Sequence, residues 1–63
     1  MPEQLSIKAW RANKGYTQQD VSDILGVSRQ TVIDWERGTV KPKGLVIYAL
    51  AKLYETEVDF IKV

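Results

Sequence analysis

The sequence predicts an all-α fold: a single domain, residues 1–63, built from five short helices. Apolar residues recur at spacings of three and four along most of the chain, the pattern of a helix buried on one face. Gly15, Gly26 and Gly38 each follow such a segment, where a helix commonly closes. The chain has no cysteine, so packing between helices must supply the stability of so short a domain.

The first two helices have recognisable start and stop signals. The first is expected after Pro2 and ends at Gly15, because glycine readily adopts the left-handed conformation that closes a helix. Its apolar spacing is formed by Leu5, Ile7, Ala9, Trp10 and Ala12. The second helix is expected after Thr17, whose hydroxyl can cap the first turn together with the carboxylate of Asp20. It ends at Gly26 after barely two turns.

The remaining helices follow from the same signals. Ser28 is a good N-cap for a third helix over residues 29–36, which the glycine at position 38 ends. Residues 39–42 are expected to form a loop, because the residue before a proline is disfavoured in a helix. A fourth helix is expected from about 43 to 54. A last short helix follows Thr56 and carries the apolar residues Val58, Phe60 and Ile61. No segment predicts a strand.

The composition excludes most enzyme classes. Without Cys or His the chain has no thiol nucleophile, no imidazole base and no thiolate or imidazole metal ligand. No GxxxxGK[ST] sequence is present, and so short a domain has little room for a substrate pocket. We therefore expect no catalysis, no cofactor, no metal and no small-molecule ligand. The longest apolar run, 45–51, is far shorter than the ~20 residues of a membrane helix, and no signal peptide is evident, so a cytoplasmic protein is expected.

The charge is nearly balanced overall but unevenly distributed. The net charge is +1, from nine basic and eight acidic residues. Between residues 29 and 43, four basic residues and two acidic ones give +2; between 53 and 63, one basic residue and three acidic ones give −2. Taken alone, this distribution indicates ordinary surface charge.

The second and third helices are separated by only Gly26 and Val27, which predicts a tight helix-turn-helix. Such a steep crossing requires a small side chain, and Ser22 provides one. On a helical wheel, one side of the third helix holds Arg29, Gln30, Ile33, Asp34 and Arg37, and the opposite side holds Ser28, Thr31, Val32 and Trp35. Arg and Gln can make bidentate hydrogen bonds to base edges, so this face favours DNA binding. The alternative is a solvated polar face on a small helical bundle.

Residues 17–38, from Thr17 to the Trp35-Glu36-Arg37-Gly38 ending, resemble the Xre-type helix-turn-helix family, which includes lambda-like phage repressors and Cro proteins. The resemblance extends to Ile7, Trp10 and Arg11 before this stretch, and to Lys41-Pro42, 50–54 and 58–61 after it. It implies a compact five-helix, lambda-repressor-like domain that binds double-stranded DNA. The function it implies is a transcriptional regulator, in particular a phage or prophage repressor or a Cro-like protein.

The resemblance also implies roles for individual residues. Base readout falls to Ser28, Arg29, Gln30, Ile33 and Asp34. Phosphate contacts fall to Gln18, Arg37, Lys41 and Lys43, and such contacts position the protein without specifying sequence. Arg11 and Glu36 correspond to a structural ion pair of the family; the alternative is two exposed charges worth at most about 1 kcal/mol.

Several positions depart from the family pattern. Ser22 stands where Ala is usual, and Gly44 where a Leu usually anchors the fourth helix. Asp34 is the least usual, because a carboxylate facing DNA repels phosphate unless it accepts from a cytosine amino group. Two other functions stay open: an antitoxin or restriction–modification controller of the same fold, and a protein-interaction adaptor that uses the last two helices.

The last third of the chain suggests a weak homodimer on a palindromic operator. The fourth helix is apolar on more than one face, and a core this small covers only part of it. The expected dimer contact consists of Val58, Phe60 and Ile61, with Val63 adding apolar surface. The alternative is that these residues complete the core.

Overall fold

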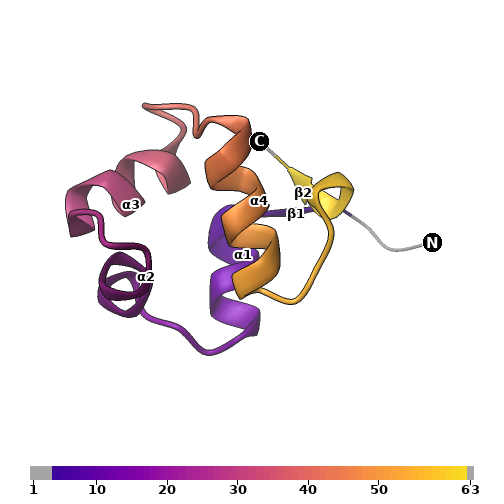
Figure 1. Cartoon of the computed structure of the whole chain (residues 1–63), viewed down its shortest axis with the longest axis horizontal. Helices are drawn as coiled ribbons and strands as arrows, with labels where there is room; N and C mark the ends of the chain where they lie inside the picture. Colours follow the sequence, from indigo (N-terminus) through magenta and orange to yellow (C-terminus); the bar gives the residue numbers. More distant parts are fainter. Residues whose placement is uncertain (1–3, 63) are drawn as a thin grey trace.

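The computed structural model describes residues 4–62, which contain four α-helices (Figure 1). These are α1 (Ile7–Asn13), α2 (Gln18–Leu25), α3 (Arg29–Arg37) and α4 (Gly44–Leu53). A turn of 3-10 helix, η1 (Val58–Phe60), and two short strands, β1 (Leu5–Ser6) and β2 (Ile61–Lys62), complete the described part. The start signal assigned to Pro2 and the apolar residue Val63 lie outside the described residues.

Side-chain caps begin the first three helices. The Ser6 hydroxyl accepts a hydrogen bond from the Ala9 amide at 3.1 Å, so α1 begins only after Leu5. Thr17 and Asp20 form the predicted capping box at the start of α2. Glycines end α2 and α3, with positive φ angles of 71° at Gly26 and 80° at Gly38. The predicted start and stop signals of α2 and α3 are therefore confirmed.

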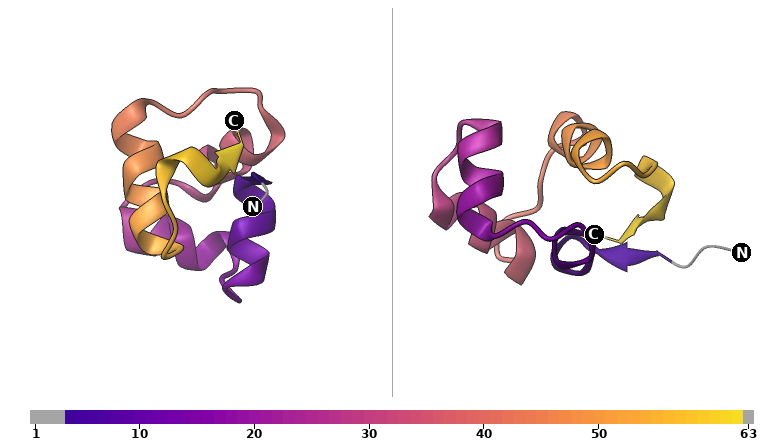
Figure 2. Two further views of the ribbon diagram at one scale, coloured as in Figure 1. Left: turned by 90° about the vertical axis from the view of Figure 1, so that its right-hand side faces the viewer. Right: turned by 90° about the horizontal axis from the view of Figure 1, so that it is seen from below.

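The expectation that the chain contains no strand is wrong. β1 and β2 pair in parallel, with Leu5 opposite Ile61 and Ser6 opposite Lys62, so the two ends of the described chain lie side by side (Figures 1 and 2). The Trp10 indole nitrogen donates to the Phe60 carbonyl at 3.0 Å and reinforces this junction. Two-residue strands are too short to produce the alternating pattern by which a strand is recognised in a sequence.

The predicted fifth helix is replaced by the single 3-10 turn η1. Its last residue is followed by Ile61, whose extended backbone (φ −99°, ψ 120°) leaves the helical region to pair with Leu5. The side chain of Ile61 is buried in the core, so pairing and burial both favour the extended conformation. The described residues thus form four α-helices and one helical turn, in place of five helices.

The core lies between α1, the α2–α3 pair and α4. Figure 2 shows how these helices are arranged. Val21, Val32 and Leu50 are almost completely buried at its centre. The remaining buried apolar residues are Ile7, Trp35, Ala51, Tyr54 and Ile61. No helix among residues 4–62 is long and apolar enough to cross a membrane.

Tyr54, which ends α4, is the largest fully buried side chain, and its hydroxyl has no hydrogen-bond partner among the described residues. Burial, with a contribution from the charge of Glu36, raises the pKa of this hydroxyl to about 12. A buried hydroxyl without a partner destabilises a fold. Tyr54→Phe is therefore expected to raise the free energy of unfolding by about 1 kcal/mol at pH 7, as measured by urea denaturation.

The same substitution has a pH-dependent consequence. The native pKa of Tyr54 lies above the unfolded value of about 10, so the unfolded state loses its proton first and stability falls as pH rises from 10 towards 12. Tyr54→Phe should remove this part of the alkaline loss, whereas Tyr48→Phe, at an exposed position, should not. If the wild type and Tyr54→Phe lose equal stability between pH 10 and pH 12, the loss does not come from the raised pKa of Tyr54.

Candidate nucleic-acid interface

The turn between α2 and α3 is held by Ser22. This side chain is buried, and its hydroxyl donates to the Val27 carbonyl at 2.7 Å. The Ser22 carbonyl accepts from the amides of Gly26 and Val27 at 2.9 and 3.1 Å. Sequence reasoning identified Ser22 as small enough for the crossing but missed that its hydroxyl bonds to the turn. That bond explains how a polar residue occupies a buried position where Ala is usual.

The two faces of α3 differ as the wheel predicts. Val32 and Trp35 are buried against α2 and the core, whereas Arg29 and Gln30 are exposed. Ser28, which the wheel places on the opposite side, is also exposed, because it precedes the helix as its N-cap and accepts from the Thr31 amide at 3.1 Å. Ile33 and Asp34 are half-buried at the edge of the exposed face. The structure therefore brings the five residues predicted for base readout together at the start and along one side of α3.

Asp34 has a partner on the same helix. The Gln30 side-chain nitrogen donates to one carboxylate oxygen of Asp34 at 3.0 Å, a contact between residues four apart. The carboxylate is thus engaged by a neighbouring amide, and its second oxygen has no role in this contact. The hydrogen bond from Gln30 thus satisfies one acceptor of Asp34 on this side of α3.

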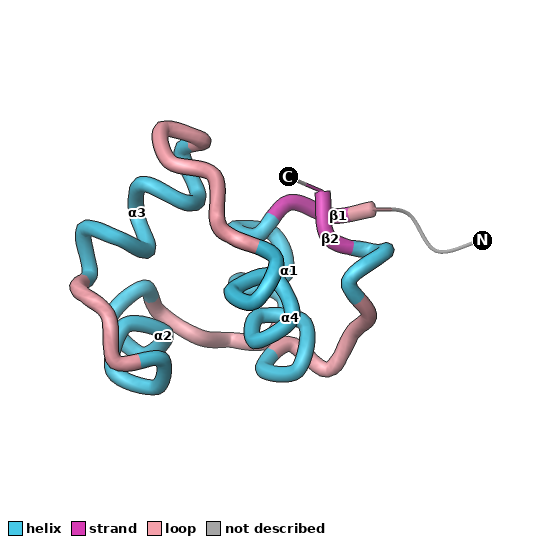
Figure 3. Tube along the Cα trace, turned by 45° about the horizontal axis from the view of Figure 1, so that its top comes forward, coloured by secondary structure: helices cyan, strands magenta, loops and turns pink. Residues whose placement is uncertain are grey.

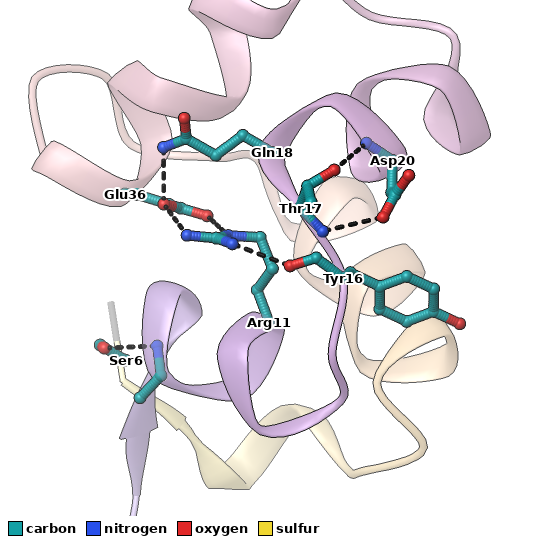
Figure 4. Close-up of polar contacts among 8 residues, drawn as sticks. Ser6, Arg11, Tyr16, Thr17, Gln18, Asp20 and Glu36 are labelled. Atoms are coloured by element: carbon teal, nitrogen blue, oxygen red, sulfur yellow. Dashed lines mark hydrogen bonds and ion pairs between the residues drawn. The ribbon is translucent and has the colours of Figure 1, made fainter.

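Arg11, Gln18 and Glu36 form a polar cluster where α1, α2 and α3 meet (Figure 4). The Arg11 guanidinium donates to the two Glu36 carboxylate oxygens at 2.6 and 3.3 Å. It also donates to the Tyr16 carbonyl at 2.8 Å, and the Gln18 amide donates to Glu36 at 3.1 Å. The Arg11 and Glu36 side chains are only 13% and 3% exposed. This cluster fixes the end of α3 against the start of α2 and neutralises the charge of Glu36.

The residues predicted to contact phosphate lie in two places. Gln18 opens α2, where its side chain is half-buried against Glu36. Arg37 is exposed at the end of α3. Lys41 and Lys43 are exposed on the segment that links α3 to α4, drawn in pink between these helices in Figure 3. The sequence had not indicated that Gln18 bonds to Glu36, because this contact requires the packing of α2 on α3.

An exposed polar helix, crossed by a second short helix and held from behind by a buried core, is the arrangement of helix-turn-helix domains. The chain belongs to this family: a helix-turn-helix family model matches residues 7–61, which confirms the resemblance to the Xre-type proteins. The match includes both helices of the turn, the polar cluster and β2 up to Ile61.

Three relatives illustrate the similarity. An uncharacterized HTH-type transcriptional regulator of Methanocaldococcus jannaschii is 36% identical over 55 residues, covering 87% of this chain and 83% of that protein. The HTH-type regulator YgzD of Bacillus subtilis is 32% identical over 53 residues, covering 84% of this chain and 80% of that protein. An SPbeta prophage-derived HTH-type regulator of Bacillus subtilis is 33% identical, covering 87% of this chain but 51% of that protein. No solved structure matches the chain.

Proposed function

We propose that the protein is a transcriptional regulator that binds double-stranded DNA in a sequence-specific manner. The observation that carries this proposal is the two-sided character of α3, with Arg29 and Gln30 exposed opposite the buried Val32 and Trp35. A helix presented in this way fits the major groove of B-DNA. The relatives described as HTH-type transcriptional regulators support the same function.

In this proposal the polar residues divide into two groups. Arg29 and Gln30 read base edges, and Ser28, Ile33 and Asp34 contact bases at the margins of the same face. Gln18, Arg37, Lys41 and Lys43 bind phosphates on either side of the groove. The Arg11–Glu36 pair does not touch DNA; it holds α3 at the angle at which both groups reach their targets.

Within this function, a phage or prophage repressor or a Cro-like protein is the role we favour, and the prophage-derived relative supports it. When such a protein occupies its operator, it blocks or recruits RNA polymerase. An antitoxin or a restriction–modification controller would use the same surface. An adaptor that binds only protein would not need Arg29 and Gln30 on one exposed face.

Selection of bound duplexes from a random pool tests the proposal. We expect enrichment of a sequence with two-fold symmetry and half-sites about one helical turn apart, with retention that weakens steeply as salt rises. A variant carrying both Arg29→Ala and Gln30→Ala is the matched control and should enrich no sequence. If the wild type enriches no sequence and its retention does not depend on salt, the protein does not act on DNA.

We further propose a weak homodimer that tightens on palindromic DNA. Ile61 cannot take part as expected from the sequence, because its side chain is 4% exposed and packs in the core. The contact would therefore be formed by Val58, which is 44% exposed, and the half-buried Phe60. The exposed α4 residues Leu45 and Tyr48 add apolar surface.

Sedimentation equilibrium with and without a two-half-site duplex tests this assembly. We expect partial dimerisation of the free protein, full occupancy of the duplex by two copies, and loss of the free dimer in Val58→Asp. A free monomer that fills the two half-sites independently would overturn the proposal. Asn13→Asp, which adds one negative charge at an exposed position of α1, outside the proposed contact, is the control and should leave dimerisation intact.

A further inference from the structure

A surface cleft of about 160 Å³ lies between the α3–α4 loop and the β1–β2 pair. Three of the side chains that line it are basic: Arg37 at the end of α3, Lys41 in the loop and Lys62 on β2. Ile7 and Trp35, both buried, form an apolar floor. The cleft thus gathers cations from segments that are far apart in the sequence.

The electrostatic character of this cleft is positive. Among the described residues that line it, Glu36 is the one carboxylate, and its side chain is 3% exposed. Glu36 is also neutralised, because Arg11 donates to it at 2.6 Å and Gln18 at 3.1 Å. The three basic side chains therefore lack a competing carboxylate in the cleft, and an anion that enters it is attracted by all three.

Lys62 reaches the cleft because of the strand pairing. The parallel register places Lys62 opposite Ser6, which also lines the cleft. Successive side chains of a strand point to opposite sides, so the burial of Ile61 directs Lys62 outward. The position of Lys62 is therefore set by the core. Lys62 is not among the phosphate contacts that the family resemblance implies, and in the sequence it lies in a segment of net negative charge.

We infer that this cleft binds the phosphate backbone of duplex DNA and that Lys62 contacts one phosphate, in addition to those that Arg37 and Lys41 contact. The inference rests on the proposed function and extends it to a part of the chain outside the helix-turn-helix. DNA is the occupant because the cleft begins at the last turn of α3 and continues along the loop proposed to follow the backbone. A backbone phosphate is an anion, so the three cationic side chains attract it.

The salt dependence of DNA affinity tests the role of Lys62. With the selected duplex, Lys62→Gln is expected to reduce the slope of log K against log salt by about 0.9, the value for one lost phosphate contact. Lys62→Arg keeps the charge and should restore the slope. Lys52→Gln removes the same charge from α4, away from the cleft, and should leave the slope as in the wild type. Circular dichroism verifies that each variant is folded.

The outcomes separate this inference from the proposed function. Binding of the wild-type protein to the duplex tests the proposed function, independently of Lys62. If the wild type binds its duplex and Lys62→Gln has an unchanged slope, the cleft is not a phosphate site and only the present inference falls. If Lys52→Gln lowers the slope equally, the effect is one of overall charge, which also overturns it. If the wild type binds no duplex but Lys62→Gln lowers its affinity for poly-glutamate, the cleft takes acidic protein, and both proposals fail.

Discussion

Arg11→Met is expected to lower the free energy of unfolding by about 3–5 kcal/mol, because it leaves a buried carboxylate without its main partner. The Glu36 side chain is 3% exposed, so water cannot replace the lost guanidinium, and only the Gln18 amide at 3.1 Å remains. The Tyr16 carbonyl loses its donor as well. For a chain of 63 residues, whose total stability is on the order of 3–9 kcal/mol, this loss would remove a large part of the stability.

The double variant Arg11→Met with Glu36→Leu separates the ion pair from its surroundings. Removing both charges eliminates the unpaired carboxylate, so much of the stability lost in Arg11→Met should return. Urea denaturation of the wild type, both single variants and the double variant measures the coupling between the two residues. Small and additive losses would mean that the pair is solvated and does not hold the three helices.

The chain offers a matched control for this experiment. Lys14 and Glu55 form a second ion pair at 3.5 Å, in which the side chains are 32% and 79% exposed. An exposed pair contributes at most about 1 kcal/mol, so Lys14→Met should change the stability little. The comparison removes one cation from each pair by the same substitution, so the difference reports burial.

Arg29→Ala is expected to lower the affinity for the preferred duplex by about 1–3 kcal/mol and to relax the preference at one base pair. The reason is that Arg29 is exposed at the first position of α3, where a recognition helix contacts bases. Quantitative binding to the preferred site and to its single-base variants measures the affinity and the preference together.

Lys41→Ala is the comparison for this second experiment. Lys41 is exposed in the loop after α3, and as a phosphate contact it should affect all sequences nearly alike while reducing the salt slope by about one. If Arg29→Ala also weakens every sequence equally, Arg29 binds phosphate and the base-reading assignment is wrong.

Most of the helical framework could be predicted because it depends on local signals. Thr17 and Asp20 cap α2 through contacts three residues apart, and Gly26 needs only its own positive φ angle to end that helix. The β1–β2 pair requires Leu5 to pair with Ile61, which is distant in the sequence, and no local pattern predicts this pairing. The same pairing shortens the predicted last helix to a 3-10 turn. The unexpected strands and the missing fifth helix therefore have one cause.

In the candidate site too, the features within one helix could be predicted and those that depend on tertiary packing could not. The exposed side of α3 follows from helical periodicity, so Arg29 and Gln30 could be placed on one face from the sequence. The contact between Gln18 and Glu36 depends on how α2 packs against α3. The position of Lys62 in the same cleft as Lys41 depends on strand register. Sequence reasoning reaches residues that share an element and misses those that tertiary packing brings together.

The strand pairing also constrains the order in which the chain folds. During synthesis, α1, α2 and α3 leave the ribosome well before Ile61, so the helix-turn-helix can form while Leu5 and the Trp10 indole still lack their partners. Joining the two ends closes a loop of nearly the whole chain, and the entropic cost of closure rises with loop length. The core is therefore completed only after residue 61 has emerged, because Leu50 and Ile61 pack in the same cluster as Val21.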